Sequence, residues 1–240
     1  NLKRLALELG SKAPNIIFAD ADIEAAAKGA FNAAFGFTGQ SCVAGARLFV
    51  QRPVYDAVLE KLTGMVKAAK IGDAFDLATD IGPIIHPSQL ETIQGYLQGG
   101  LDQGATLWHG GRRLTEGAYA GGCYMEPAIL TDARDDMTVA REEIFGPVVP
   151  VLPFETEQEV IARANNTSYG LAAGVWSRDV AQAHRVAGAV KAGVVWVNSY
   201  DRFDPAVPFG GFKGSGYGRD NGQEVIEAYT EVKSVWVSLT

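Results

Sequence analysis

Short runs of apolar and β-branched residues alternate along this chain with longer segments in which apolar residues recur at helical spacing. The short runs predict strands and the periodic segments predict helices. Strands are expected over residues 14–19, 47–51, 104–113, 127–132, 148–154, 171–177 and 193–198. Helices are expected over residues 23–35, 54–70, 87–104, 156–165 and 180–190, with Asp20 or Asp22 as the cap of the first and Asp179 as the cap of the last.

Strands separated by helices of about 10–15 residues are typical of crossover connections. We therefore expect an α/β fold with a mainly parallel twisted sheet that helices flank on both faces. Residues 71–85 are rich in Asp, Gly and Pro and are predicted to form a long connection. The glycine-rich segment 208–219 is predicted to be a loop that bends sharply or approaches another segment closely, and it does not match a dinucleotide-binding G-x-G-x-x-G.

Charge and composition narrow the possible partners. The formal net charge of −7 argues against nucleic acid and anionic membranes, and the apolar runs are far shorter than the ~20 residues that cross a bilayer. With two cysteines, Cys42 and Cys123, a disulfide framework is excluded, and we expect free thiols in a cytoplasmic protein. The three histidines lack the spacing of metal ligands, so no metal site is predicted.

Cys42 is the first candidate for chemistry. It lies in the segment FTGQSCVAGAR, a tight polar loop in which backbone amides can point at a ligand and stabilise a thiolate or an oxyanion. A buried structural cysteine is the competing interpretation, because most free cysteines are buried. The local sequence does not decide between the two.

Three carboxylates are further candidates. Glu8 is surrounded by leucines, where desolvation would raise its pKa into the range of a general base, but an exposed strand residue paired with Lys3 or Arg4 is the simpler interpretation. Glu142 and Glu143 are expected where a helix end turns into a strand, and a solvated helix terminus would explain them equally well. His86 and His109 are expected at the surface.

Six ordered segments resemble the aldehyde dehydrogenase superfamily, and the similarity extends over essentially the whole chain. LELGSKAPNIIFADAD is similar to the glutamate signature of the family, with Ser11 in place of one glycine, and FTGQSCVAGARLFVQ is similar to its cysteine signature. The other segments are REEIFGPV, NNTSYGLAAGVWSRD, AGVVWVN and PFGGFKGSGYGR. The order of six segments is far more specific than any one motif and favours Cys42 as a nucleophile.

The resemblance implies a role for each matching residue. Cys42 would attack the aldehyde to form a thiohemiacetal, and loss of hydride to NAD or NADP would give a thioester. Glu8 would activate the water that hydrolyses the thioester, so that the product is a carboxylic acid. Gly10, Glu143 and Phe145 would contact the nicotinamide end of the cofactor. The residues expected along the aldehyde tunnel are Asn198, Asp201, Phe203 and Phe209.

The resemblance also implies a division of the chain, because family members are about twice as long. Residues 1–10 would be the last strand of a cofactor domain that is mostly missing, and residues 11–214 the catalytic domain. Residues 215–231 would be a helix that returns to the cofactor domain, and residues 232–240 a strand that pairs with another subunit of a dimer or tetramer. The chain starts at Asn1 directly before an apolar segment, so we expect a fragment of a longer protein.

Three functions remain open from the sequence. The first is the catalytic region of an aldehyde dehydrogenase, which by itself should oxidise aldehydes poorly because half of the cofactor site and half of the oxyanion hole lie outside it. The second is a thiol esterase that uses Cys42 and Glu8 without a nicotinamide. The third is a binding or assembly module that has lost catalysis.

Overall fold

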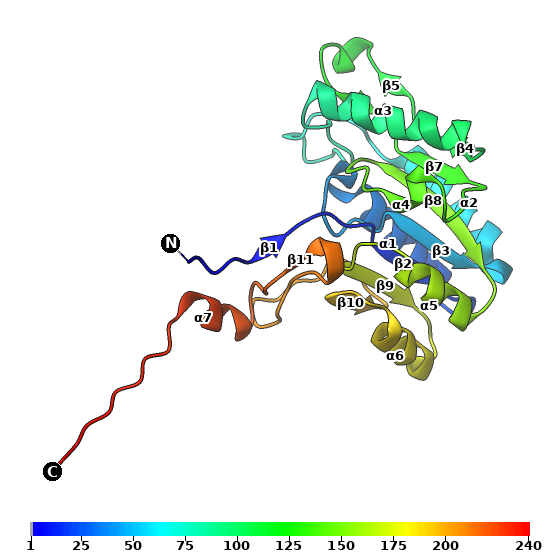
Figure 1. Cartoon of the computed structure of the whole chain (residues 1–240). Coiled ribbons are helices and arrows are strands. Elements are labelled where there is room, and N and C mark those ends of the chain that lie inside the picture. The colour runs from blue at the N-terminus through cyan, green and yellow to red at the C-terminus, as the bar shows by residue number, and fades with distance from the viewer. Residues whose placement is uncertain (1) are drawn as a thin grey trace.

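A twisted sheet forms the centre of the molecule in the computed structural model, which describes residues 2–240 (Figure 1). Within these residues, seven strands pair in the order β10-β9-β2-β3-β8-β7-β4. Their bounds are β2 Pro14–Ile17, β3 Arg47–Gln51, β4 Thr106–His109, β7 Ala128–Thr131, β8 Val148–Phe154, β9 Ala172–Trp176 and β10 Val194–Val197. Neighbouring strands are parallel except for β4, which is antiparallel to β7. The predicted α/β fold with a mainly parallel sheet is confirmed.

Helices cover both faces of this sheet. The bounds are α1 Ile23–Phe35, α2 Tyr55–Ala68, α3 Pro87–Asp102, α4 Thr138–Arg141, α5 Glu157–Asn165 and α6 Val180–Ala189. Alternate residues of β2 enter different cores, since Ile16 packs with α3, α4, α5 and α6 whereas Ile17 packs with α1 and α2. Strands buried on both faces account for the continuous apolar runs in the sequence.

Two aspartates near α1, Asp20 and Asp22, accept hydrogen bonds from different elements. The Asp22 carboxylate accepts a hydrogen bond from the Ala25 N–H and caps α1, as predicted. Asp20 does not cap the helix. Its carboxylate instead accepts hydrogen bonds from the Ser177 hydroxyl and from the N–H groups of Arg178 and Asp179, so it fastens the end of β9 to the end of β2.

The predicted connection and turn segments also have defined structure. Residues 71–85 contain an isolated parallel bridge between Ile71 and Ile81 and otherwise form turns, as expected for a connection. Two short strands that the sequence pattern did not predict, β5 (Arg113–Leu114) and β6 (Tyr124–Met125), form an antiparallel ribbon beside the sheet. Two-residue strands are too short to produce a periodic pattern.

The N-terminal segment and the C-terminal part of the chain project from the same side of the body (Figure 1). The strand β1 (Leu7–Glu8) pairs antiparallel with β11 (Gly216–Tyr217). The expected strand over 1–10 is thus confined to two residues, and the expected helix over 215–231 is wrong for its first part, because only α7 (Glu224–Tyr229) is helical. Positive φ angles at Gly216, Gly218, Asn221 and Gly222 exclude a helix there.

Residues 232–240 are exposed and pair with no strand in the described part of the chain. Helix α7 is joined to the N-terminal segment through Arg4, whose guanidinium donates to the carbonyls of Glu227 and Thr230 and forms an ion pair with Glu231. Among the helices of residues 2–240, none is long and apolar enough to span a bilayer.

Candidate active site

Cys42 lies in a loop that connects α1 to β3. Helix α1 ends at Phe35, and a 3₁₀ turn over Gly36–Gly39 follows, in which Phe37 and Thr38 adopt positive φ angles of 50° and 59°. Two consecutive non-glycine residues in the left-handed region are unusual and cost energy, so the surrounding contacts must fix them. Such strain commonly accompanies functional loops.

Hydrogen bonds from several elements fix the Cys42 loop. The Thr38 hydroxyl donates to the Gly82 carbonyl at 3.2 Å, and the Gln40 amide oxygen accepts from the Ile85 N–H at 2.8 Å. On the other side of the thiol, the Tyr200 hydroxyl donates to the Val43 carbonyl at 2.8 Å. The loop is therefore held from the connection 71–85 and from the segment after β10, which orients a half-buried Cys42.

Gly39 and Gly45 allow the loop to pack closely. Gly39 has a φ of +66°, and a Cβ there would collide with the Gly146 carbonyl of the turn before β8. Gly45 donates its N–H to the Ala33 carbonyl at 2.9 Å, and a Cβ there would lie 2.9 Å from the Cβ of Ala33. Both glycines are therefore required by close approach, which agrees with the tight loop predicted from the sequence.

Two small cavities flank the Cys42 loop, and they have Ser41 and Ala44 in common. The first also reaches Gly39, Ser11, Glu143 and Phe145. Its complete lining is Ser11, Ala34, Gly39, Ser41, Ala44, Ala46, Glu143, Ile144, Phe145, Gly146 and Val148. The second is lined by Asn32, Ala33, Gly36, Phe37, Ser41, Val43, Ala44, Tyr200 and Asp201. The fold thus places the thiol loop between two groups of residues that are far apart in the sequence.

The environment of Cys42 opposes its ionisation. Burial raises the pKa of the Cys42 thiol, and the Glu8 and Glu143 carboxylates raise it further. The backbone N–H groups of Cys42 and Val43 lower the pKa, as expected for a loop whose amides face the sulfur, but their effect is smaller. In the isolated chain Cys42 is therefore a thiol that needs a base to become a nucleophile.

Glu8 is presented by β1 at the edge of this site. Partial desolvation raises the pKa of its carboxyl, Asp220 raises that pKa further, and Arg219 lowers it. Glu8 is exposed on β1, as the alternative of an exposed strand residue expects, but among residues 2–240 it forms no ion pair with Lys3 or Arg4, and Arg4 pairs with Glu231 instead. Glu8 thus has a carboxyl group with a raised pKa that lies near enough to Cys42 to affect the ionisation of its thiol.

The glycine-rich segment 208–219 holds the strand that carries Glu8. The buried Ser215 hydroxyl donates to the Gly10 carbonyl at 2.7 Å and accepts from the Gly170 N–H at 2.9 Å, and the Ser215 carbonyl accepts from the Leu9 N–H. A Cβ at Gly216, whose φ is +123°, would collide with the Leu7 carbonyl. The predicted close approach of this loop to another segment is confirmed.

Gly10, Glu143 and Phe145 meet on the same side of the Cys42 loop. Glu143 lies in the turn between α4 and β8, as predicted, and its Oε1 accepts from the Ser11 N–H at 2.9 Å. A Cβ at Gly10 would lie 2.5 Å from Glu143 Oε2, so a larger residue there would displace that oxygen. Phe145, with a φ of 53°, is 40% exposed, and its carbonyl accepts from the Gln89 side chain of α3.

The four residues expected along an aldehyde tunnel follow β10, and three of them share one region. Asp201 lines the second cavity, while Phe203 and Phe209 pack edge to face with ring centroids 5.4 Å apart. Phe203 also contacts Trp196. The Asn198 amide is engaged elsewhere, since it accepts from the Ser177 N–H and donates to the Ser177 carbonyl.

Other residues of the site were not predicted from the sequence. Tyr200 holds the Cys42 loop, Asp220 affects Glu8, and Lys12 is buried beside Glu143. Tyr200 and Lys12 lie within two residues of residues predicted for the site, so the sequence could have indicated them. The proximity of Glu8 to Asp220 depends on the fold and could not be read from the sequence.

The described residues offer no metal site. His86 accepts from the Ser88 N–H at the start of α3. In residues 2–240, no group of three His, Cys, Asp or Glu could hold a metal ion.

Comparison with known proteins explains this arrangement. The model of the family described as "Aldehyde dehydrogenase family" matches residues 1–235. The chain belongs to the aldehyde dehydrogenase family. A curated relative, betaine aldehyde dehydrogenase from Brucella anthropi, is 46% identical over 239 residues, which are 100% of this chain and 49% of the relative.

Solved structures agree with the family assignment. The NAD+ complex of an aldehyde dehydrogenase from Bacillus cereus is 47% identical, with a TM-score of 0.94 over 99% of this chain and 48% of the other. A betaine aldehyde dehydrogenase from Staphylococcus aureus, in complex with NAD+, is 43% identical with a TM-score of 0.91 over 93% of this chain and 44% of the other. The chain thus spans about half the length of these aldehyde dehydrogenases.

Proposed function

We propose that this chain is the catalytic half of an NAD(P)-dependent aldehyde dehydrogenase, with Cys42 as nucleophile and Glu8 as general base. The observation that carries the proposal is the position of the Cys42 loop between two cavities, one lined by Glu143 and Phe145 and the other by Tyr200 and Asp201. A nucleophile between a cofactor side and a substrate side is the arrangement that covalent aldehyde oxidation requires.

The protein residues would carry out two half-reactions. Glu8 accepts the proton of the Cys42 thiol, and the sulfur attacks the aldehyde carbon to form a C–S bond. The backbone N–H of Cys42 donates to the oxyanion that develops. A bound nicotinamide cofactor supplies the acceptor for the hydride that leaves this carbon, and a thioester remains. Glu8 releases the thiol proton to solvent and then takes a proton from water. The resulting hydroxide attacks the thioester, and the C–S bond breaks to release a carboxylic acid and the Cys42 thiolate, which takes its proton back from Glu8.

The residues on the Glu143 side fit the nicotinamide end of such a cofactor. Gly10 leaves space next to Glu143 Oε2, and the half-exposed Phe145 ring offers an apolar surface. A carboxylate is a suitable acceptor for the hydroxyl groups of a ribose. The relatives from Bacillus cereus and Staphylococcus aureus were solved with NAD+, which makes NAD+ the first cofactor to test, with NADP+ as the alternative.

The aromatic residues after β10 favour an aldehyde with an apolar or cationic group. The exposed Phe203 packs against the partly buried Phe209 and against Trp196, and aromatic faces attract both apolar groups and quaternary ammonium ions. Betaine aldehyde is therefore the first substrate to test, because relatives with that name are 46% and 43% identical to the chain. Asp201, which lines the second cavity, completes the proposed substrate region, whereas the Asn198 amide is bonded to Ser177 and is not assigned to it.

The nucleophile can be tested on the 240-residue chain with an activated ester such as p-nitrophenyl acetate. We expect acylation of Cys42, detected by mass spectrometry, because ester cleavage needs the thiol but no cofactor. Glu8→Gln should still be acylated but should release the acyl group slowly, since the base that activates water is lost. Cys42→Ser should abolish acylation, and Cys123→Ser should leave it unchanged.

Several outcomes would contradict the proposal. Unchanged acylation in Cys42→Ser would favour an assembly module without catalysis. Robust NAD+-dependent turnover by the 240-residue chain alone would show that aldehyde oxidation does not require the contacts to the adenosine end of the cofactor that are expected outside this chain. Ester cleavage at the same rate with or without NAD+, together with a full-length protein that does not oxidise aldehydes, would favour the thiol esterase.

Two further expectations belong to the same proposal. Residues 232–240 are proposed to pair with a second copy of the chain, because their apolar side chains are exposed. A cytoplasmic location is proposed from the two free cysteines. Neither nucleic acid nor a membrane is proposed as a partner.

A further inference from the structure

We propose that Lys12 is a positioning residue for Glu143, and that its buried ammonium group, together with the Ser11 N–H, keeps the Glu143 carboxylate ionised and directed at its ligand. The proposal rests on the proposed function in one respect, because it takes that ligand to be the ribose next to the nicotinamide. The coupling between Lys12 and Glu143 can be measured independently of any ligand.

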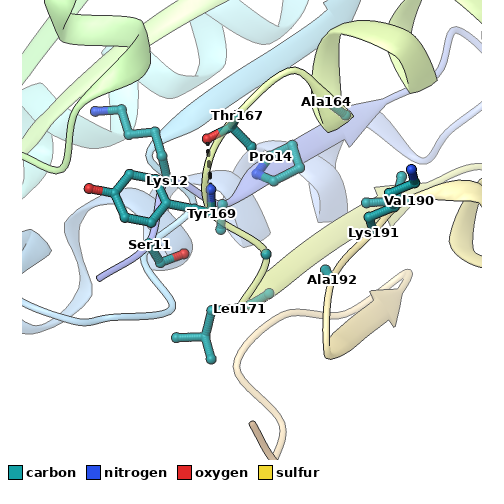
Figure 2. A pocket seen from close by; sticks show the side chains of 13 residues that line it. Ser11, Lys12, Pro14, Ala164, Thr167, Tyr169, Leu171, Val190, Lys191 and Ala192 are labelled. Carbon is teal, nitrogen blue, oxygen red and sulfur yellow. Dashed lines mark hydrogen bonds between the residues drawn. The ribbon is translucent and has the colours of Figure 1, made fainter. Parts of the chain in front are cut away.

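Lys12 is a buried cation without a direct partner. The residue is 1% exposed, and its Nζ has no hydrogen-bond partner among residues 2–240. It lines a small cavity together with Ser11 and Tyr169, and Figure 2 shows the polar ends of the Lys12 and Tyr169 side chains on the same side. A methionine would fill the same volume without desolvating a charge, so packing alone does not account for a lysine here.

Three consecutive residues surround the Glu143 carboxylate. Gly10 leaves the space that Oε2 occupies, since a Cβ there would lie 2.5 Å away. The Ser11 N–H donates to Oε1 at 2.9 Å. Lys12 follows directly and is electrostatically coupled to the same carboxylate. One short segment before β2 therefore supplies the space, the hydrogen bond and the compensating charge.

The charged groups around Lys12 indicate that Glu143 is the carboxylate that compensates its charge. Arg47 of β3 repels the ammonium, and its own guanidinium is occupied by the carbonyls of Lys12, Arg163 and Ala164. Glu142 and Glu143 attract the ammonium, but Glu142 already accepts from the Tyr96 hydroxyl of α3 at 2.8 Å. Tyr169 adds a neutral hydroxyl. Of the two carboxylates, the exposed Glu142 is engaged by Tyr96, whereas the half-buried Glu143 forms no ion pair with a cation among residues 2–240.

The ionisation of Lys12 and the ionisation of Glu143 depend on each other. Burial, followed by Arg47, lowers the pKa of Lys12 to about 7, and Glu143 and Glu142 raise it. Burial raises the pKa of Glu143, whereas the Ser11 N–H and Lys12 lower it. Each charge therefore stabilises the other, and removal of either must shift the titration of its partner by linkage.

The experiment compares Lys12→Met with the exposed control Lys67→Met in the 240-residue chain. We expect the Glu143 carboxyl, followed by ¹³C NMR, to titrate at higher pH in Lys12→Met and to be unchanged in Lys67→Met. Nicotinamide mononucleotide, which carries the relevant ribose, should bind about fivefold more weakly to Lys12→Met near neutral pH. Lys12→Arg, which retains the charge, should restore most of the binding.

A second variant keeps the proposal testable if Lys12→Met does not fold. In Glu143→Gln the Lys12 ammonium should titrate at lower pH than in the parent chain, because its compensating charge is gone. An unchanged Lys12 titration in Glu143→Gln, or an unchanged Glu143 titration in a folded Lys12→Met, would overturn the proposal. Reciprocal shifts without any binding of the mononucleotide to the parent chain would instead contradict the role of Glu143 in the proposed function.

Discussion

The Cys42 thiol and the Glu8 carboxyl affect each other through charge. Burial and the Glu8 carboxylate raise the pKa of Cys42, so the resting thiol remains protonated until a base removes its proton. The pKa of Glu8 is itself raised, so its carboxylate is a stronger proton acceptor than that of an ordinary glutamate. A thiol that is activated only when needed is less prone to unwanted oxidation or alkylation.

Replacement of Glu8 by Gln should make Cys42 more reactive in the absence of substrate. The carboxylate destabilises the neighbouring thiolate, so its removal should lower the pKa of Cys42 and move the pH profile of alkylation to lower pH. The rate of iodoacetamide labelling can be followed in a Cys123→Ser background. Glu60→Gln, at an exposed position of α2, is the matched control. Slower labelling in Glu8→Gln would mean that Glu8 acts on the resting thiol mainly as a proton acceptor.

Local sequence predicted part of the site and missed the contacts between distant residues. The tight loop around Cys42 and the turn that carries Glu143 could be predicted, because glycines and a change of periodicity mark them. That Asp220 lies close enough to raise the pKa of Glu8 could not be predicted, since 212 positions separate them and the two segments meet only in the fold, through contacts such as the pairing of β1 with β11. The family resemblance supplied candidate roles that local patterns left undecided.

At the scale of secondary structure, prediction succeeded where an element is buried. Helix α1 and strand β3 have the predicted bounds, because α1 has a capping aspartate and β3 is a continuous apolar run. The order of the strands could not be deduced, since β2 lies between β3 and β9, which are 120 residues apart. The helix over 215–231 was expected from the family resemblance, and the left-handed residues in the first part of that segment restrict the helix to Glu224–Tyr229.

The glycine-rich loop is predicted to stabilise the strand β1 through Ser215. Ser215→Ala removes the two hydrogen bonds of a fully buried hydroxyl and leaves the Gly10 carbonyl and the Gly170 N–H without partners. Unsatisfied buried groups of this kind cost about 1–3 kcal/mol each. Denaturant unfolding should therefore show a clear loss of stability, whereas Ser238→Ala, in the exposed C-terminal segment, should show none.

The same variant should also affect the position of Glu8. If Ser215 holds β1 in place, the alkylation profile of Cys42 in Ser215→Ala should shift toward that of Glu8→Gln, because a mobile carboxylate has less influence on the thiol. A loss of stability with an unchanged alkylation profile would limit Ser215 to a purely structural role. An unchanged free energy of unfolding would contradict the importance of its hydrogen bonds.

For the whole molecule, the two chain ends form a unit that extends from the body (Figure 1). Arg4 joins the N-terminal segment to the end of α7, and β1 pairs with β11. Beyond this unit the last nine residues expose Val232, Val235, Trp236, Val237 and Leu239. A monomer rarely exposes such a continuous apolar segment, and an extended segment with free backbone groups favours pairing with another chain.

Removal of residues 232–240 should therefore lower the oligomeric state of the chain. Light scattering after gel filtration should give a dimer or tetramer for the parent chain and a smaller species for the truncated one. Trp236→Lys should weaken the assembly in the same direction, because Trp236 is 94% exposed within one chain and a lysine opposes burial at an interface. The body should remain folded, since none of these side chains contributes to its two cores. If parent and truncated chains have the same mass per particle, the segment does not mediate assembly, and its apolar residues need another partner.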